Sequence, residues 1–122
     1  MQVNFDTNTN YKPQFGNYEI TEKALIHLKQ RFMTPKDLDR FEKVIKHFDK
    51  KGELIEGKLD EINGDLTASI FSSGRYSETK TEGWFSHLFR SPIHFIENWA
   101  KRADKVEAQI KNDIRLEEIA KK

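Results

Sequence analysis

Hydrophobic and polar residues alternate on both sides of Asn63-Gly64, which is the pattern of a β-hairpin. Asn-Gly is the strongest short-range turn signal, because both central residues of a type I′ turn need a positive φ. With this pair at the tip, Ile62 faces Asp65, and the predicted hairpin runs from Glu53 to Ser72. Successive side chains of a strand point to opposite faces, so one face of this hairpin is apolar. That face carries Ile55, Leu59, Leu66, Ala68 and Ile70.

The opposite face of the hairpin is polar, so only one face needs a cover. It carries Glu56, Lys58, Asp60, Thr67 and Ser69. Its apolar exceptions are Leu54, Ile62 and Phe71. Because two strands alone are only marginally stable, we expect helices to pack on the apolar face.

Helix-period sequence precedes the hairpin. Thr21 predicts the cap of a helix that runs to about Phe32. The apolar positions of this helix are Ala24, Leu25, Leu28 and Phe32. Thr34-Pro35-Lys36-Asp37 predicts a second start, with a cap, a proline in the first turn and a capping-box carboxylate. Its stripe is Leu38, Phe41, Val44, Ile45 and Phe48, and its expected end is Lys50-Lys51-Gly52.

A long helix is predicted from Ser91-Pro92 to about Ala120. Its apolar residues recur mostly at alternating steps of three and four, as in a coiled-coil seam. They are Ile96, Trp99, Ala103, Val106, Ile110 and Ile114. At ~1.5 Å per residue the helix is roughly 43 Å long, well beyond the ~13 Å radius of gyration of a domain of this size. We therefore expect one end to project from the domain or to pack on another molecule.

Three segments complete the chain. Residues 1–19 show spaced aromatics and no helical period, which predicts an N-terminal arm, either flexible or pinned by its aromatic side chains. Residues 75–81 predict a third antiparallel strand or a loop, and residues 83–90 predict one or two helical turns. The predicted fold class is α+β, with two short N-terminal helices, a β-hairpin or three-stranded sheet, and a long C-terminal helix. Residues 20–122 are expected to form a single domain.

Composition excludes several function classes. The 122 residues have a formal net charge of +1, so no strong global field recruits nucleic acid or an anionic membrane. The chain has no cysteine, which excludes disulfides, thiolate metal sites and cysteine nucleophiles. The N-terminus lacks the basic and apolar regions of a signal peptide, and no stretch approaches the ~18 apolar residues of a membrane span. We expect a cytoplasmic protein that does not act at a membrane.

Candidate chemistry is weak in this sequence. The four histidines, at positions 27, 47, 87 and 94, do not have the spacing of a helical zinc site. His27 and His47 lie beside the apolar stripes of their helices, so we expect both to be exposed. Carboxylates crowd the hairpin, where charge usually protects a strand edge and keeps it soluble. We therefore predict no catalytic residue, no metal and no cofactor; a small enzyme that uses the hairpin carboxylates and a histidine is the third alternative.

Residues 75–102 are the strongest functional candidate, because cations alternate there with aromatic residues. This mixture suits a protein interface or base stacking. It also suits simple closure of the core over the hairpin, which is the interpretation with most weight. The interface candidates are Arg75, Tyr76, Trp84, Phe85, Phe89, Arg90, Trp99 and Arg102.

The favoured hypothesis is a small, non-catalytic intracellular binding or adaptor protein. It would act through this aromatic and basic segment and through the long amphipathic helix, with a protein as its partner. The long helix could also pair with a second copy through residues 96–114. The runner-up is a nucleic-acid-associated module, against which the low net charge weighs. It would use Arg75, Lys80, Arg90, Lys101 and Arg102.

Overall fold

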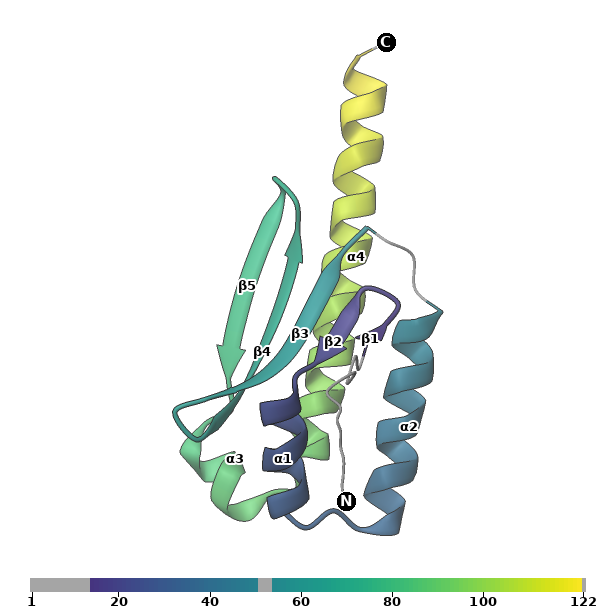
Figure 1. The fold of residues 1–122 in the computed structure, drawn as a ribbon. Helices are drawn as coiled ribbons and strands as arrows, with labels where there is room; N and C mark the ends of the chain where they lie inside the picture. The colour runs from purple at the N-terminus through teal and green to yellow at the C-terminus, as the bar shows by residue number, and fades with distance from the viewer. Residues whose placement is uncertain (1–13, 51–53, 122) are drawn as a thin grey trace.

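A computed structural model describes residues 14–50 and 54–121 of the chain and confirms the α+β class. Five strands form one mixed sheet in the order β1-β2-β3-β4-β5 (Figure 1). Neighbouring strands are antiparallel except β2 and β3, which run parallel. The elements are β1 (Gln14–Phe15), β2 (Tyr18–Ile20), α1 (Glu22–Gln30), α2 (Pro35–Asp49), β3 (Glu56–Ile62), β4 (Asp65–Ser72), β5 (Tyr76–Thr81), α3 (Trp84–Phe89) and α4 (Ile93–Ala120).

The predicted hairpin is β3 and β4, and its register is confirmed. Asn63 and Gly64 have φ values of 55° and 87°, as a type I′ turn requires. Ile62 pairs with Asp65 at the tip, and the five residues of the predicted apolar face are at most 6% exposed. Residues 76–81 form the third antiparallel strand, β5, which pairs with β4 along its whole length. Residues 51–53, which include the predicted start of the hairpin, lie outside the described residues.

Two short strands, β1 and β2, occupy part of the predicted N-terminal arm. The sequence pattern did not reveal them, because strands of two and three residues are too short to show a period. Tyr18 of β2 is fully buried, and its ring stacks on Phe48 of α2 with centroids 3.9 Å apart. The aromatic positions Phe5 and Tyr11 lie outside the described residues.

Both predicted helix starts before the hairpin are confirmed. The Thr21 hydroxyl accepts a hydrogen bond from the Ala24 amide at 3.1 Å and caps α1. Thr34 and Asp37 form a reciprocal capping box at the start of α2.

Two assignments to the apolar stripes of these helices are wrong. The helix α1 ends at Gln30 because Arg31 takes an extended backbone conformation, so Phe32 falls in the following link and is 83% exposed. At the other end of that link, Leu38 in the first turn of α2 is 51% exposed. Val44 and Phe48 of α2 are buried as expected.

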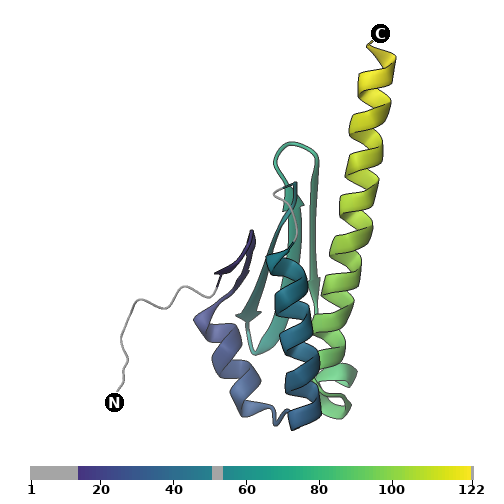
Figure 2. The same ribbon diagram turned by 90° about the vertical axis from the view of Figure 1, so that its right-hand side faces the viewer.

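The helix α4 extends from Ile93 to Ala120 and packs on α2 and β4. Its predicted stripe is buried from Ile96 to Ile110, and Ile114 packs partly against the core. Beyond that point α4 extends past the sheet and the other helices (Figures 1 and 2), and Leu116 and Ile119 are exposed. Among the described residues, no helix is both long enough and apolar enough to cross a membrane.

Three aromatic rings join β2, α2 and α4 at the centre of the core. The rings of Phe48 and Trp99 meet edge to face with centroids 4.7 Å apart, and Tyr18 approaches Trp99 at 6.0 Å. The indole N–H of Trp99 donates a hydrogen bond to the carbonyl of Ser69 in β4 at 3.1 Å. Gly57 of β3 lies directly against Tyr18, where a larger residue would not fit.

Candidate functional site

The predicted interface residues divide between two separate surfaces. Trp84, Phe85, Phe89 and Arg90 belong to α3 and the turn after it, at one end of the molecule. Tyr76 and Arg102 meet between β5 and α4. Trp99 belongs to the core, whereas Arg75 lies on the β4–β5 turn and donates to Glu117 at 2.9 and 3.0 Å.

The helix α3 exposes all of its large apolar side chains. Trp84, Phe85, Leu88 and Phe89 are 70%, 59%, 64% and 68% exposed, and we call these four residues the α3 surface. The expectation that the aromatics of this segment close the core is therefore wrong for Trp84, Phe85 and Phe89. No residue of α3 is buried, and the Phe85 ring contacts those of Trp84 and Phe89 instead.

A buried polar cluster holds α3 in place. Glu82, directly before α3, is 2% exposed and forms a two-pronged ion pair with the Arg31 guanidinium of the α1–α2 link. Arg31 also donates to the main-chain carbonyls of Arg90, at 2.9 Å, and Ser86, at 3.3 Å. The Ser86 hydroxyl donates to Glu82 at 2.7 Å. Phe32, the exposed neighbour of Arg31, belongs to the α1–α2 link, and this link lies at the same end of the molecule as α3 (Figure 1).

His27 belongs to this cluster, so its predicted exposure is wrong. Its side chain is on the buried side of α1, 7% exposed, with its ring edge to face with His87 of α3 at 5.3 Å. Burial, followed by the nearby Arg31 charge, lowers the pKa of His27 and favours the neutral imidazole. The expectation failed because position 27 lies on the same buried side of α1 as Ala24 and Leu28, and a histidine there does not contribute to the hydrophobic pattern.

The cluster also brings together a donor set that no local spacing predicts. Ligand atoms of His27, Glu82 and His87 all lie within 4.8 Å of one another, and such donors suit zinc. However, Arg31 binds both carboxylate oxygens of Glu82 and lies 3.4 Å from Nε2 of His27. The guanidinium therefore provides the positive charge of the cluster, and a metal would have to displace it. We infer that His27, Glu82 and His87 hold α3 against α1.

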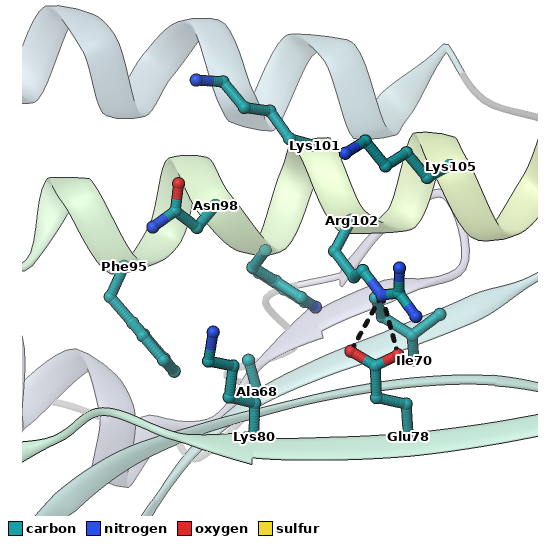
Figure 3. Close-up of a pocket in the computed structure, with 10 residues that line it drawn as sticks. Ala68, Ile70, Glu78, Lys80, Phe95, Asn98, Lys101, Arg102 and Lys105 are labelled. Carbon is teal, nitrogen blue, oxygen red and sulfur yellow. Dashed lines mark hydrogen bonds and ion pairs between the residues drawn. The ribbon is translucent and has the colours of Figure 1, made fainter.

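The second surface is a pocket between α4 and strands β4 and β5, which we call the α4–β5 pocket (Figure 3). Its volume is about 500 Å³. Arg102 donates to Glu78 at 2.8 and 3.1 Å and to the Tyr76 hydroxyl at 3.0 Å. The bonds from Tyr76 and Arg102 lower the pKa of Glu78. The residues that line the α4–β5 pocket are Ala68, Ile70, Glu78, Lys80, Phe95, Asn98, Trp99, Lys101, Arg102 and Lys105.

The hairpin carboxylates serve local structure. Asp60 accepts hydrogen bonds from the Thr21 hydroxyl and the Glu61 amide, both at 2.8 Å. Glu61 accepts from the Gly64 amide in the turn at 2.6 Å. These bonds tie the start of α1 to β3 and stabilise the tight turn.

Comparison of the chain with models of protein families, with curated proteins and with solved structures found no match. The two surfaces are therefore interpreted from their own geometry.

Proposed function

We propose that this protein is a non-catalytic binding protein that docks onto a protein partner through the α3 surface. The observation that carries the proposal is the exposure of Trp84, Phe85, Leu88 and Phe89 on one six-residue helix. Clustered exposed apolar side chains of this kind mark interaction sites, and Trp is among the residues that most often dominate interface energies.

The energetics favour burial of this helix in a complex. Full burial of a large apolar side chain contributes about 1.5–3 kcal/mol, and α3 has four such side chains that are exposed. The cluster of Arg31 and Glu82 fixes the helix before a partner arrives, so less conformational entropy is lost on docking.

The chemistry of the surface favours an apolar protein groove over nucleic acid. From Gly83 to Phe89 the side chains include no Lys, Arg, Asp or Glu, and Arg90 supplies a cation only at the margin. Nucleic-acid binding rests on phosphate neutralisation, for which α3 offers no charge. Of the other cations of the nucleic-acid alternative, Arg75 is bonded to Glu117 and Arg102 to Glu78. Lys80, Lys101 and Arg102 line the separate α4–β5 pocket.

The test uses two matched sets of exposed apolar residues. The first variant carries Trp84→Ser, Phe85→Ser and Phe89→Ser; the control carries Leu116→Ser and Ile119→Ser at the projecting end of α4. Circular dichroism checks that both fold. Light scattering measures self-association, and affinity capture from the source cells identifies partners, which are then purified for titration calorimetry.

We expect the α3 variant to weaken the partner interaction by about 30-fold or more, which corresponds to loss of one hot spot of ~2 kcal/mol. The control should bind within about twofold of wild type. If the wild type forms a dimer that the α3 variant abolishes, the partner is a second copy of the chain. Equal binding by wild type and the α3 variant, or an equal loss in the control, would contradict the proposal.

A further inference from the structure

We propose that the α4–β5 pocket binds an aromatic phosphate of mononucleotide size. The pocket combines an apolar, aromatic floor with a cationic rim, and these are the two features that such a ligand needs (Figure 3). Its volume of about 500 Å³ lies within the range of ~300–1,000 Å³ typical of small-molecule sites. The inference concerns a different surface from α3 and does not depend on the proposed function.

The apolar floor of the pocket is held in place by the core. Trp99 is fixed by its hydrogen bond to Ser69 and by its contact with Phe48, so its ring cannot swing away. Phe95 lies one helical turn earlier on α4, and Ala68 of β4 leaves space between the strand and the helix. Trp99 and Phe95 are 4% and 8% exposed, so a planar ring in the pocket would contact the small part of each ring that the core leaves uncovered.

The rim carries an excess of positive charge. Four cations and one carboxylate are among the lining residues, a formal charge of +3, whereas the whole chain has a formal net charge of +1. Of the three lysines, only Lys80 is directed into the pocket in this structure (Figure 3). The carboxylate, Glu78, already accepts hydrogen bonds from Arg102 and Tyr76. A phosphate would therefore meet Lys80, because the Arg102 guanidinium is already paired with Glu78.

The lysines of the pocket lining come from β5 and α4 and differ in direction (Figure 3). Lys80 rises from β5 towards α4 and the aromatic floor, as Figure 3 shows. Lys101 and Lys105 are spaced four apart on α4, where like charges repel one another. Their ammonium groups extend from the other side of the helix in this structure, and the flexible lysine side chain allows them to turn towards a bound anion. Lys80 is therefore the cation on which phosphate binding should depend most.

The experiment uses Trp99 as an internal reporter. The chain has two tryptophans, and Trp84 lies on α3 outside the pocket, so Trp84→Phe leaves Trp99 as the only fluorophore of its kind. AMP is titrated into this protein at low salt, with adenosine as the ring without the charge and inorganic phosphate as the charge without the ring. A single-stranded oligoadenylate distinguishes a free nucleotide from a nucleic-acid strand as the source of the same chemistry.

We expect saturable quenching of Trp99 by AMP and binding of adenosine and of phosphate at least about 10-fold weaker, since each lacks one of the two contacts. Lys80→Gln should weaken AMP binding by about 10-fold, the size of one hydrogen bond to a charged group. Lys111→Gln, an exposed α4 lysine outside the pocket, should leave binding unchanged.

Three results would overturn the inference: no saturable quenching by AMP, equal binding of AMP and adenosine, or the same loss for Lys80→Gln and Lys111→Gln. If the oligoadenylate binds more tightly than AMP and loses affinity in Lys80→Gln, the pocket holds a base of a strand. If it binds independently of Lys80, its site is not this pocket, and a strand is refuted as the source.

Discussion

Substitution of Gly57 by alanine tests whether the core is organised around Tyr18. An ideal Cβ at Gly57 would lie 2.5 Å and 2.7 Å from Cδ2 and Cε2 of Tyr18, and 3.1 Å from Cζ2 of Trp99. The first two distances are far below normal van der Waals contact. The Tyr18 ring cannot retreat, because it stacks against Phe48 at 3.9 Å with an interplanar angle of 5°. Strand β2 would have to shift instead.

The expected cost follows from this geometry. Extra volume in a packed core usually destabilises by about 1–3 kcal/mol. Alanine regains about 0.4–1 kcal/mol by restricting the unfolded chain, because no positive φ is required at Gly57. Because the 2.5 Å approach places the cost in the upper part of that range, we expect a net loss of roughly 1–2.5 kcal/mol, which for a domain of this size lowers the melting temperature by about 4–10 °C.

Urea unfolding of a double-mutant cycle isolates the contact. Tyr18→Leu removes the ring and should cost about 2–4 kcal/mol by itself through lost burial and packing. In the Tyr18→Leu background, Gly57→Ala should be at least about 1 kcal/mol less harmful than in the wild type, because the clashing ring is gone. Gly83→Ala is the matched control: its Cβ meets nothing within 4 Å, and its φ is −70°.

Additive effects of the two substitutions would refute the reasoning, as would a Gly83→Ala loss as large as that of Gly57→Ala. Additive effects would show that the Tyr18 ring does not cause the loss at Gly57. A large Gly83→Ala loss would show that alanine is costly even at a glycine with open space around it. A Gly57→Ala variant as stable as the wild type would also refute it, because β2 and β3 would then have moved to accommodate the methyl group despite the stack of Tyr18 on Phe48.

Three further predictions concern caps and buried ionisable groups. Thr34→Ala removes the capping box of α2 and should lower the urea-unfolding free energy by about 1 kcal/mol. Burial raises the pKa of Tyr18, so its contribution to stability is present below pH about 10 and is lost as the pH rises above that value. Tyr18→Phe should flatten the decline measured between pH 9 and 11, and should be close to neutral at pH 7, since the buried hydroxyl has no hydrogen-bond partner among the described residues. The pKa of His27 is lowered, so stability is lost as the pH falls below about 6.5. His27→Gln should therefore reduce the loss of unfolding free energy between pH 7 and pH 5. An unchanged loss would show that His27 does not cause the acid sensitivity.

Local sequence chemistry was sufficient to predict much of this fold. The Asn63-Gly64 turn determines its own register, because one slip would move every apolar side chain to the wrong face. Thr21 and Thr34 cap helices through bonds to residues three positions away. The stripe that contains Ile96 and Ile110 likewise needs only the helical period. Each of these signals operates within a few residues, so a single sequence can show it.

The parts that were missed depend on contacts between distant segments. Tyr18 lies in a strand of three residues, which is stabilised by pairing with β3 and by the stack of Tyr18 on Phe48. His27 is buried because it contacts α3 and the residue before it. Its neighbours Glu82 and His87 are more than fifty residues away in the sequence. The α4–β5 pocket combines residues of two strands and one helix, so only Arg102 and Trp99 of its lining were among the predicted interface residues.

The aromatic rings of α3 take no part in the aromatic centre of the core. Tyr18, Phe48 and Trp99 form that centre, and Trp84, Phe85 and Phe89 stay exposed. The chain instead buries an Arg31–Glu82 pair beneath α3, although removing two charges from water is costly and a well-packed apolar contact is often at least as stable. An ion pair differs from an apolar contact in fixing direction. It holds Gly83 and the start of α3 at a set place while leaving the helix's apolar side chains free to bind. A costly buried ion pair beneath an exposed apolar helix is therefore the feature that the proposed binding role would explain and core packing alone would not.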